Sequence, residues 1–128
     1  MDRWAINALL EDLKNPDARV RERATAELWH IWFHQKGAYG LELLERAQAF
    51  LEAGEVVRAE QAITELIEDQ PDFAEAWNRR AVFYYTMGQY QKAIADCQKV
   101  LELNPVHFGA LHGLGLCHAA LREYNEAI

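Results

Sequence analysis

The sequence contains no serine, only two cysteines, three prolines and seven glycines, and no long apolar run. The missing serine excludes a Ser-His-Asp triad and a serine nucleophile elbow. So few glycines and prolines argue against an all-β protein, which needs many tight turns. No apolar stretch approaches the roughly 20 residues that a membrane-spanning helix requires, so we expect no membrane insertion.

The cysteines and histidines do not form a recognisable metal or redox motif. Cys97 and Cys117 make neither a CxxC pair nor a ligand cluster. We interpret both as buried apolar thiols in a reducing compartment, and expect a cytoplasmic protein. His30 and His34 follow Glu27 at helical spacing, which can chelate zinc from one helix face. Because the HExxH motif is missing, we interpret them as a helix edge and expect neither a metal nor another cofactor.

The residues that are present favour a helical protein with one acidic block. Ala, Leu and Glu dominate, and about half of the 128 residues are hydrophobic, which fits a soluble globular chain. The net charge of −7 comes from residues 40–73, which hold nine acids and two bases. Residues 1–39 and 74–128 are each balanced. An acidic block repels polyanions, so we expect no nucleic-acid partner.

An internal repeat appears when the sequence is compared with a copy of itself shifted by 34 residues. With this shift, Leu43 aligns with Trp77, and Trp77 aligns with Leu111. The same shift aligns these further sets of residues: Ala47, Ala81 and Gly115; Phe50, Tyr84 and His118; Val56, Tyr90 and Tyr124; Ala59, Ala93 and Ala127.

One copy of this repeat is interpreted as a pair of helices. Trp77, Ala81 and Tyr84 are spaced i, i+4, i+7 and form one stripe of a helix. Gly88 can take the left-handed conformation that ends a helix. A second helical stripe follows over residues 90–101, and Pro105 stops it. Each copy is therefore a helix, a tight turn, a second helix and a turn marked by proline.

This pattern resembles the tetratricopeptide repeat (TPR), with copies at 40–73, 74–107 and 108–128. The resemblance implies an all-α fold, a right-handed superhelical solenoid of antiparallel helix hairpins. The second copy carries residues of the preferred type at seven positions: Trp77, Ala81, Tyr84, Gly88, Tyr90, Ala93 and Pro105. The third copy is incomplete and has Arg122 in place of the glycine; we expect its second helix to start near Tyr124.

Residues 1–39 are expected to form another helix pair. Asn15 or Asp17 can cap a helix, and Pro16 fits a first helical turn. Apolar stripes lie on both sides of this turn: Ile6, Leu9, Leu10 and Leu13 before it, and Val20, Ala24, Leu28 and Ile31 after it. Residues 15–28 resemble the core of a HEAT repeat. We expect this pair to cap the open side of the first TPR copy, with Gly37 as the break between them.

The basic run of Arg19, Arg21 and Arg23 alternates with Val20 and Glu22. A helix spreads such residues around its circumference, so we interpret the run as a salt-bridged face and not as a nucleic-acid patch.

In TPR proteins the first helices of successive copies line a concave groove that binds peptides or helices of other proteins. The resemblance places these residues in this groove: Leu44, Glu75, Val82, Thr86, Gly109, Gly113 and Leu116. It also places there the residues that we take as candidate binding residues: Glu45, Gln48, Glu52, Asn78, Arg79, Tyr85 and His112. We expect Arg79 either to bind a carboxylate of the partner or to pair with Glu45 or Glu75.

The positions of a carboxylate clamp for chaperone tails hold Leu44, Gln48, Arg79, Gly109 and Gly113. Four of the five lack the required chemistry, and Arg79 alone cannot recreate the clamp. We therefore do not expect a receptor for chaperone tails.

The expected function is a non-enzymatic protein–protein interaction module with no catalytic residue. The alternative is a structural module that oligomerises through residues 108–128, because the incomplete third copy exposes an apolar face. That face indicates either a fragment of a longer array or a surface covered by a partner chain. Arg80 stands where TPR proteins usually have an aliphatic residue; we expect its stem along the core edge and its head on a carboxylate.

Overall fold

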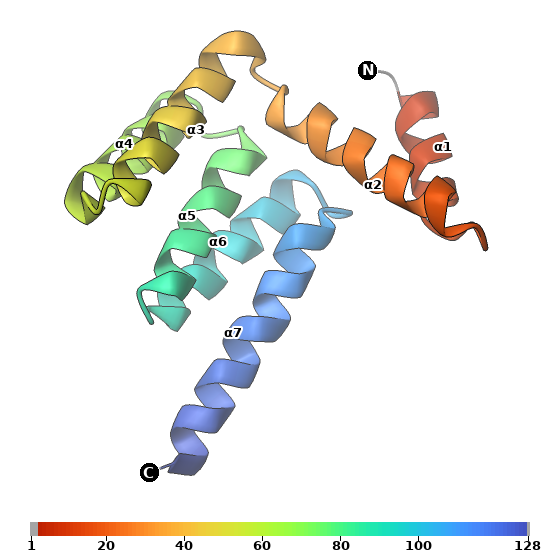
Figure 1. Ribbon diagram of the computed structural model, residues 1–128. Coiled ribbons are helices and arrows are strands. Elements are labelled where there is room, and N and C mark those ends of the chain that lie inside the picture. The colour runs from red at the N-terminus through yellow and green to blue at the C-terminus, as the bar shows by residue number, and fades with distance from the viewer. Residues whose placement is uncertain (1–2, 128) are drawn as a thin grey trace. The chain divides into compact units, whose positions relative to one another are not determined.

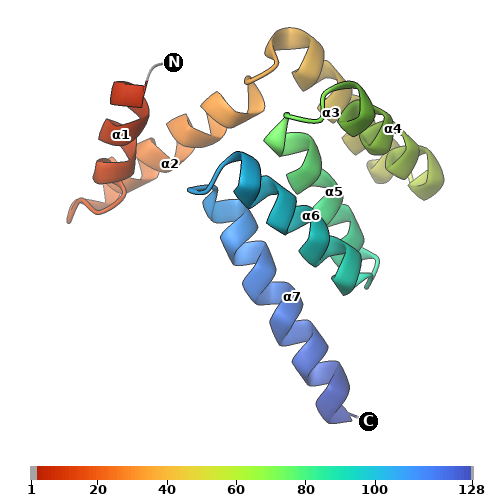
Figure 2. The same cartoon turned by 180° about the vertical axis from the view of Figure 1, so that it is seen from behind.

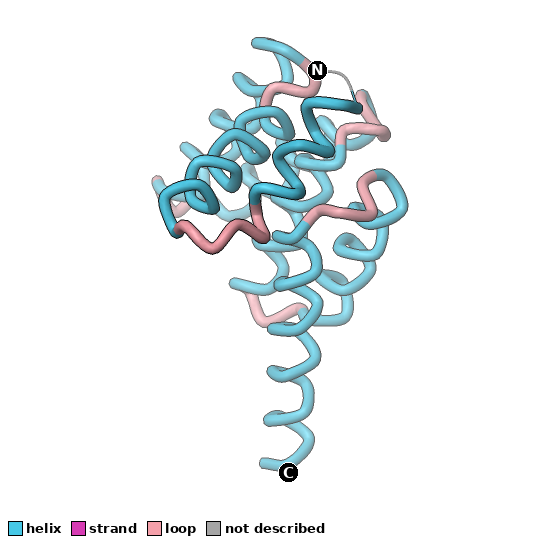
Figure 3. The backbone as a smooth tube through the Cα atoms, turned by 90° about the vertical axis from the view of Figure 1, so that its right-hand side faces the viewer, coloured by secondary structure: helices cyan, strands magenta, loops and turns pink. Residues whose placement is uncertain are grey.

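The structure is a computed structural model that describes residues 3–127. These residues form seven α-helices: α1 (Arg3–Asp12), α2 (Ala18–Phe33), α3 (Gly37–Glu52), α4 (Val56–Asp69), α5 (Ala74–Thr86), α6 (Tyr90–Leu103) and α7 (Phe108–Ala127). Short loops join them, and no strand occurs between residues 3 and 127 (Figures 1 and 3). The predicted all-α, TPR-like fold is confirmed. No helix in this range is long and apolar enough to span a membrane.

The chain divides into two compact units, residues 1–41 and 42–128. In the first unit, α1 and α2 form the predicted helix pair, with Ala24 and Leu28 of α2 buried. Asp17 is the N-cap of α2, and its side chain accepts the Arg19 N–H at 2.9 Å. Pro16 lies before this cap, so its expected place in the first turn was wrong. That the pair caps the first TPR copy stays a prediction.

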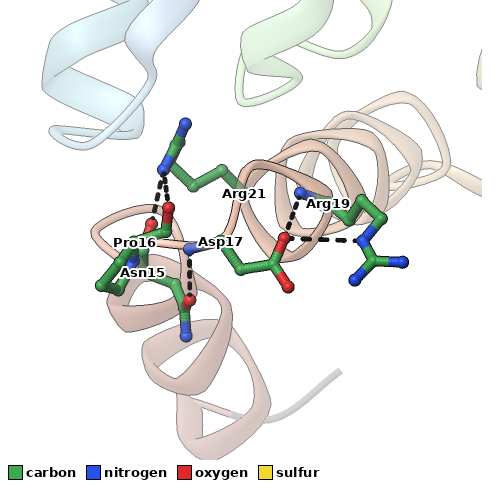
Figure 4. A network of polar contacts seen from close by, with 5 residues as sticks. All are labelled: Asn15, Pro16, Asp17, Arg19 and Arg21. Atoms are coloured by element: carbon green, nitrogen blue, oxygen red, sulfur yellow. Dashed lines mark hydrogen bonds and ion pairs between the residues drawn. The ribbon is translucent and has the colours of Figure 1, made fainter.

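The loop between α1 and α2 is held by a local polar network (Figure 4). The Asp17 N–H donates to Asn15 Oδ1 at 2.9 Å. Arg21 Nη1 donates to the carbonyls of Asn15 and Pro16 at 2.8 and 2.9 Å. Arg19 Nε lies 3.6 Å from Asp17 Oδ1. Two of the three arginines of the basic run thus fix the start of α2.

The turn within the second copy uses Gly88 as predicted, and the turn within the first copy uses Gly54 in the same way. Gly54 and Gly88 have φ values of 79° and 76°, in the left-handed region. After α5 the Gly88 N–H donates to the Tyr85 carbonyl at 3.0 Å and the Gln89 N–H to the Tyr84 carbonyl at 2.8 Å, the two bonds of a Schellman motif. The same pair of bonds recurs at Gly54. A residue with a Cβ is disfavoured there, which explains the glycine.

The core of the second unit lies where α5, α6 and α7 pack together, as both ribbon views show (Figures 1 and 2). Ala81 and Ala93, the small residues of the repeat, are buried at the contact of α5 and α6. A cluster of small and medium side chains from α5, α6 and α7 forms the centre of this core: Ala74, Ala81, Cys97, Val100 and Ala110. Trp77 packs against the cluster and donates through Nε1 to the Pro71 carbonyl at 2.9 Å.

The expectation for Arg80 is confirmed. Its Nε and Nη2 donate to the two carboxylate oxygens of Asp96 on α6 at 2.8 and 2.9 Å. Its guanidinium lies 5.2 Å from the ring centroid of Trp77 and 5.7 Å from that of Tyr84. A planar fork matched to a carboxylate and stacked on aromatic rings suits arginine better than lysine. Arg80 therefore ties α5 to α6 at the edge of the core.

The third copy differs from the expectation. We expected a turn at Arg122 and a second helix near Tyr124, but α7 runs from Phe108 to Ala127 without a break. Arg122 lacks the glycine's access to the left-handed conformation seen at Gly54 and Gly88, so nothing ends the helix at this position. The last turns of α7 extend past the ends of α5 and α6 (Figures 1 and 2). The side chain of Tyr124 lies outside the described residues.

Candidate functional site

Three of the candidate groove residues form a chain of hydrogen bonds between α3 and α5. Arg79 Nη1 donates to Gln48 Oε1 at 2.9 Å, and Gln48 Nε2 donates to Glu52 Oε1 at 3.3 Å. We call these three residues the α3–α5 relay. Glu45 lies one turn before Gln48 on α3, and its side chain is exposed. The relay leaves the carboxylates of Glu45 and Glu52 at the surface, so this part of the groove carries negative charge.

Arg79 donates to Gln48, and the expected pairings of its guanidinium, with a carboxylate of the partner or with Glu45 or Glu75, stay predictions. Another expectation for this region was wrong. Leu44 and Glu75 were placed in the groove, but both are buried, with exposed fractions of 2% and 1%. Leu44 is apolar and gains from leaving water. Glu75 is buried because a residue inside the protein donates a hydrogen bond to its carboxylate.

That residue is His107, which sequence reasoning left unassigned. His107 precedes α7 and is fully buried. Its Nδ1 lies 3.1 Å from the backbone N–H of Ala110, which can only donate, so Nδ1 accepts. The ring proton is then on Nε2, which donates to Glu75 Oε1. The imidazole thus caps α7 with one nitrogen and holds the carboxylate of α5 with the other.

The sequence carried one signal for this contact. His107 stands one repeat after Phe73, and both residues directly precede the first helix of the following copy. Phe73 is also fully buried. A histidine at the position of a buried aromatic residue needs polar partners, which the sequence alone does not identify because Glu75 lies 32 residues away.

The other candidate residues border a pocket of about 150 Å³ between α5 and α7, which we call the α5–α7 pocket. The lining residues from α5 are Asn78, Ala81, Val82 and Tyr85. Those from α7 are Gly109, His112, Gly113, Leu116 and Cys117, and Cys97 comes from α6. Three candidate residues, Asn78, Tyr85 and His112, therefore meet at one hollow. Glu45, Gln48 and Glu52 do not line it.

Small side chains make room for the α5–α7 pocket. Gly109 and Gly113 present no side chain, and Ala81 presents only a methyl group. A Cβ on Gly113 would lie 3.2 Å from Cys97 Sγ, which is tighter than ordinary contact. By contrast, a Cβ on Gly115, further along α7, would meet nothing within 4 Å. Glycine at 113 thus keeps the pocket open.

The two thiols at this pocket are buried, and burial disfavours their thiolate forms. Burial raises the pKa of Cys97 to about 11, and the neighbouring Cys117 and Asp96 add to the shift. Burial also raises the pKa of Cys117. The thiolate is the nucleophile and metal ligand, so such thiols serve as apolar lining. Val82 and Leu116, on opposite walls, are both partly exposed and give the pocket apolar edges.

His30 and His34 of α2 contact each other. The rings of His30 and His34 stack with centroids 4.0 Å apart, and His34 Nδ1 donates to the His30 carbonyl at 2.8 Å. Among the side chains that the structure describes, no group of three His, Cys, Asp or Glu could hold a metal ion.

Comparison with known proteins adds to this geometry. The family model described as tetratricopeptide repeat matches residues 74–107. A TPR repeat-containing protein of Rhizobium etli is 40% identical over 110 residues, 85% of this chain and 54% of that protein. A human protein SGT1 homolog is 34% identical over 68 residues, 53% of this chain and 19% of that protein. Hsp70-Hsp90 organizing protein 1 of Glycine max is 27% identical over 124 residues, 93% of this chain and 21% of that protein.

The chain spans about half the length of the Rhizobium etli relative and about a fifth of the other two. The similarity agrees with the structure in its helix pairs, its glycine turns and its contact of small residues between α5 and α6. The chain belongs to the tetratricopeptide repeat family.

Proposed function

We propose that this chain is a non-enzymatic interaction module that binds an extended segment or a helix of a partner protein along the groove formed by α3, α5 and α7. The observation that carries the proposal is the α5–α7 pocket. It is an apolar hollow bordered by an amide, a phenol and an imidazole from Asn78, Tyr85 and His112. Apolar pockets with a few polar groups at the edge are typical of binding sites.

The geometry of the α3–α5 relay supports the proposal that the ligand is a protein. Arg79 is half-buried and its guanidinium already donates to Gln48, so it is held in place before any ligand arrives. A positioned guanidinium binds a carboxylate or a peptide carbonyl with little further loss of side-chain freedom. The exposed carboxylates of Glu45 and Glu52 suit a basic side chain and disfavour nucleic acid.

Relatives of the chain are consistent with such a role. The name of Hsp70-Hsp90 organizing protein 1 says that this relative organises other proteins. A clamp for charged peptide tails is not the form we propose here, because Gly109 and Gly113 offer no cationic side chain on α7.

The test is selection of random peptides displayed on phage against the wild-type chain, followed by affinity measurements. The double variant Arg79→Glu with Tyr85→Ala is expected to weaken the selected peptides at least tenfold, because it reverses a charge and removes an aromatic wall. Arg58→Glu is the matched control, since Arg58 is an exposed arginine of α4 that pairs with Glu55 at the surface. Equal binding by the double variant would contradict the groove, provided that its helix content is unchanged.

A second candidate function is self-assembly through α7. The stripe of α7 that corresponds to Trp77, Ala81 and Tyr84 is Leu111, Gly115 and His118, and all three are exposed. Leu111 has an exposed fraction of 53%, whereas its counterpart Trp77 packs on the core. Sedimentation velocity at increasing concentration tests this candidate. Self-association that Leu111→Asp abolishes would favour it, and a constant monomer would exclude it.

A further inference from the structure

The size and lining of the α5–α7 pocket limit what it can accept. It holds about 150 Å³. Apolar cavities of about this volume hold a group of the size of benzene. Its walls are methyl groups, thiols and the apolar edges of Val82 and Leu116, so a charged or strongly polar group would lose its hydration there without compensation. A single aliphatic or methionine side chain fits both the volume and the chemistry.

The groups at the edge of the pocket suit an extended backbone. Asn78 and His112 occupy equivalent positions of α5 and α7, one repeat apart, and both line the pocket. A side-chain amide offers both a donor and an acceptor, and an imidazole offers one of each. An extended segment has unpaired backbone N–H and C=O groups on either side of an inserted side chain. Asn78 and His112 can therefore bind the backbone that carries the inserted residue.

Charge complementarity fixes the second feature of the occupant. Beyond Arg79, which is engaged with Gln48, the groove ends in the exposed carboxylates of Glu45 and Glu52 on α3. These residues belong to the segment 40–73, which contains nine acidic and only two basic residues. A lysine or arginine of the partner is attracted to this end. A second copy of the chain, with its own net charge of −7, is repelled by it.

The spacing follows from helix packing. Packed helices lie roughly 8–10 Å apart, so the distance from the α5–α7 pocket to α3 is roughly 12–15 Å, about one and a half helix spacings. An extended chain advances about 3.4 Å per residue, so this distance corresponds to about four residues. The inserted side chain and the basic side chain should thus be three to five positions apart.

We propose that the α5–α7 pocket receives one aliphatic or methionine side chain of an extended partner segment that carries a lysine or arginine three to five residues away, over Glu45 and Glu52. The inference rests on the proposed function and states the chemistry of the partner.

The experiment uses random peptides displayed on phage and selected on the wild-type chain. Enriched peptides are expected to share an aliphatic or methionine residue and a basic residue at this spacing. In a synthetic enriched peptide, alanine at the apolar position should weaken binding about 10- to 50-fold, because up to three buried carbons are lost. Glutamate at the basic position should weaken binding several-fold at low salt, and this difference should disappear in high salt.

Two matched variants locate the bound side chain. Leu116→Asp places a carboxylate on the pocket wall, whereas Leu111→Asp makes the same change on the same helix outside the pocket. Both leucines are partly exposed, so neither substitution removes a core residue. Only Leu116→Asp should abolish binding of the enriched peptides.

The other outcomes overturn the inference in distinguishable ways. Enriched peptides without the apolar residue or without the basic residue, or equal binding by Leu116→Asp, would overturn it and leave the groove function standing. Failure to enrich any peptide over a heat-unfolded sample would overturn the groove function as well. Self-association that Leu116→Asp disperses and Leu111→Asp does not would identify a second copy as the occupant, against the proposal.

Discussion

The buried contact between His107 and Glu75 predicts that neither residue tolerates a change alone, whereas the two tolerate a change together. The informative perturbation is His107→Phe, which restores the aromatic residue that stands at the equivalent position, Phe73. Phenylalanine retains the apolar burial of the ring but offers no nitrogen. It therefore removes the hydrogen bond to Glu75 and the cap on Ala110 in one step.

The magnitude follows from the burial of the carboxylate. Glu75 is 1% exposed, and its Oε2 has no hydrogen-bond partner even in the intact protein. Loss of one partner of a buried pair destabilises by about 3–5 kcal/mol, because the remaining charge has neither water nor a donor. Loss of the N-cap acceptor adds about 0.5–2 kcal/mol. The sum is comparable to the entire stability of an ordinary domain, about 5–15 kcal/mol.

A substitution of Glu75 should destabilise the chain less than His107→Phe does. The double variant should lose less stability than the two single variants added together. Glu75→Leu leaves the buried Nε2–H of His107 without an acceptor, which should destabilise by about 1–3 kcal/mol. In the double variant both unsatisfied groups are gone, and only the cap on Ala110 is missing. We expect the double variant to lose about 0.5–2 kcal/mol, because only the cap is missing. The coupling energy of the cycle should then be about 4–8 kcal/mol, the sum of the two penalties for a stranded polar group.

The assay is urea unfolding of the four proteins followed by circular dichroism at 222 nm, with hydrogen exchange at the Ala110 amide as a local readout. Glu102→Leu, at an exposed glutamate of α6, is the control and should change stability by less than about 0.5 kcal/mol. Additive effects, with a coupling energy below about 0.5 kcal/mol, would refute the reasoning, because they would mean that the carboxylate finds water or another donor when the imidazole is removed.

Three further outcomes are expected. Gly115→Ala should stabilise the chain by up to about 1 kcal/mol through helix propensity, and Gly113→Ala should gain measurably less in thermal melts, because its Cβ would lie 3.2 Å from Cys97 Sγ. Alkylation of Cys97 at pH 8 should be about 100-fold slower in the folded than in the unfolded chain, because burial raises its pKa from 9.0 to about 11. The same pKa shift stabilises the folded state below pH 9.0, and this stabilisation is lost as the pH rises towards 11. Gly88→Ala should destabilise by about 1–2 kcal/mol in urea, since φ is 76° and the loss is one of backbone conformation without any clash.

The elements that could be predicted from the sequence are those fixed by local chemistry and a repeating pattern. The period of the repeat, the left-handed glycines at 54 and 88 and the proline after α6 each indicate a helix boundary, and the helices of the second copy begin and end there. The ion pair of Arg80 was also predictable, because a charged head on an otherwise apolar stripe needs a carboxylate within reach.

The remaining features depend on contacts between residues that are distant in sequence. The pattern placed Glu75 in the groove, and only its contact with His107 buries it. The period of the repeat predicts a turn at Arg122, but the missing glycine at this position lets α7 continue to Ala127. The resemblance placed Gly109 and Gly113 in the groove as positions without clamp side chains. Their missing side chains also contribute to a pocket whose existence depends on how closely α5 and α7 approach.

The capping histidine has a consequence for how a chain of similar repeats avoids misassembly. Phe73 and His107 occupy equivalent positions of successive repeats, and so do Leu41 and Glu75. A slip of one repeat during folding would set Glu75 against phenylalanine and His107 against leucine. Each mismatch would strand a polar group away from water, with a penalty that a purely apolar junction would not impose. The polar contact between Glu75 and His107 thus gives the correct order of the repeats a lower free energy than a slipped order.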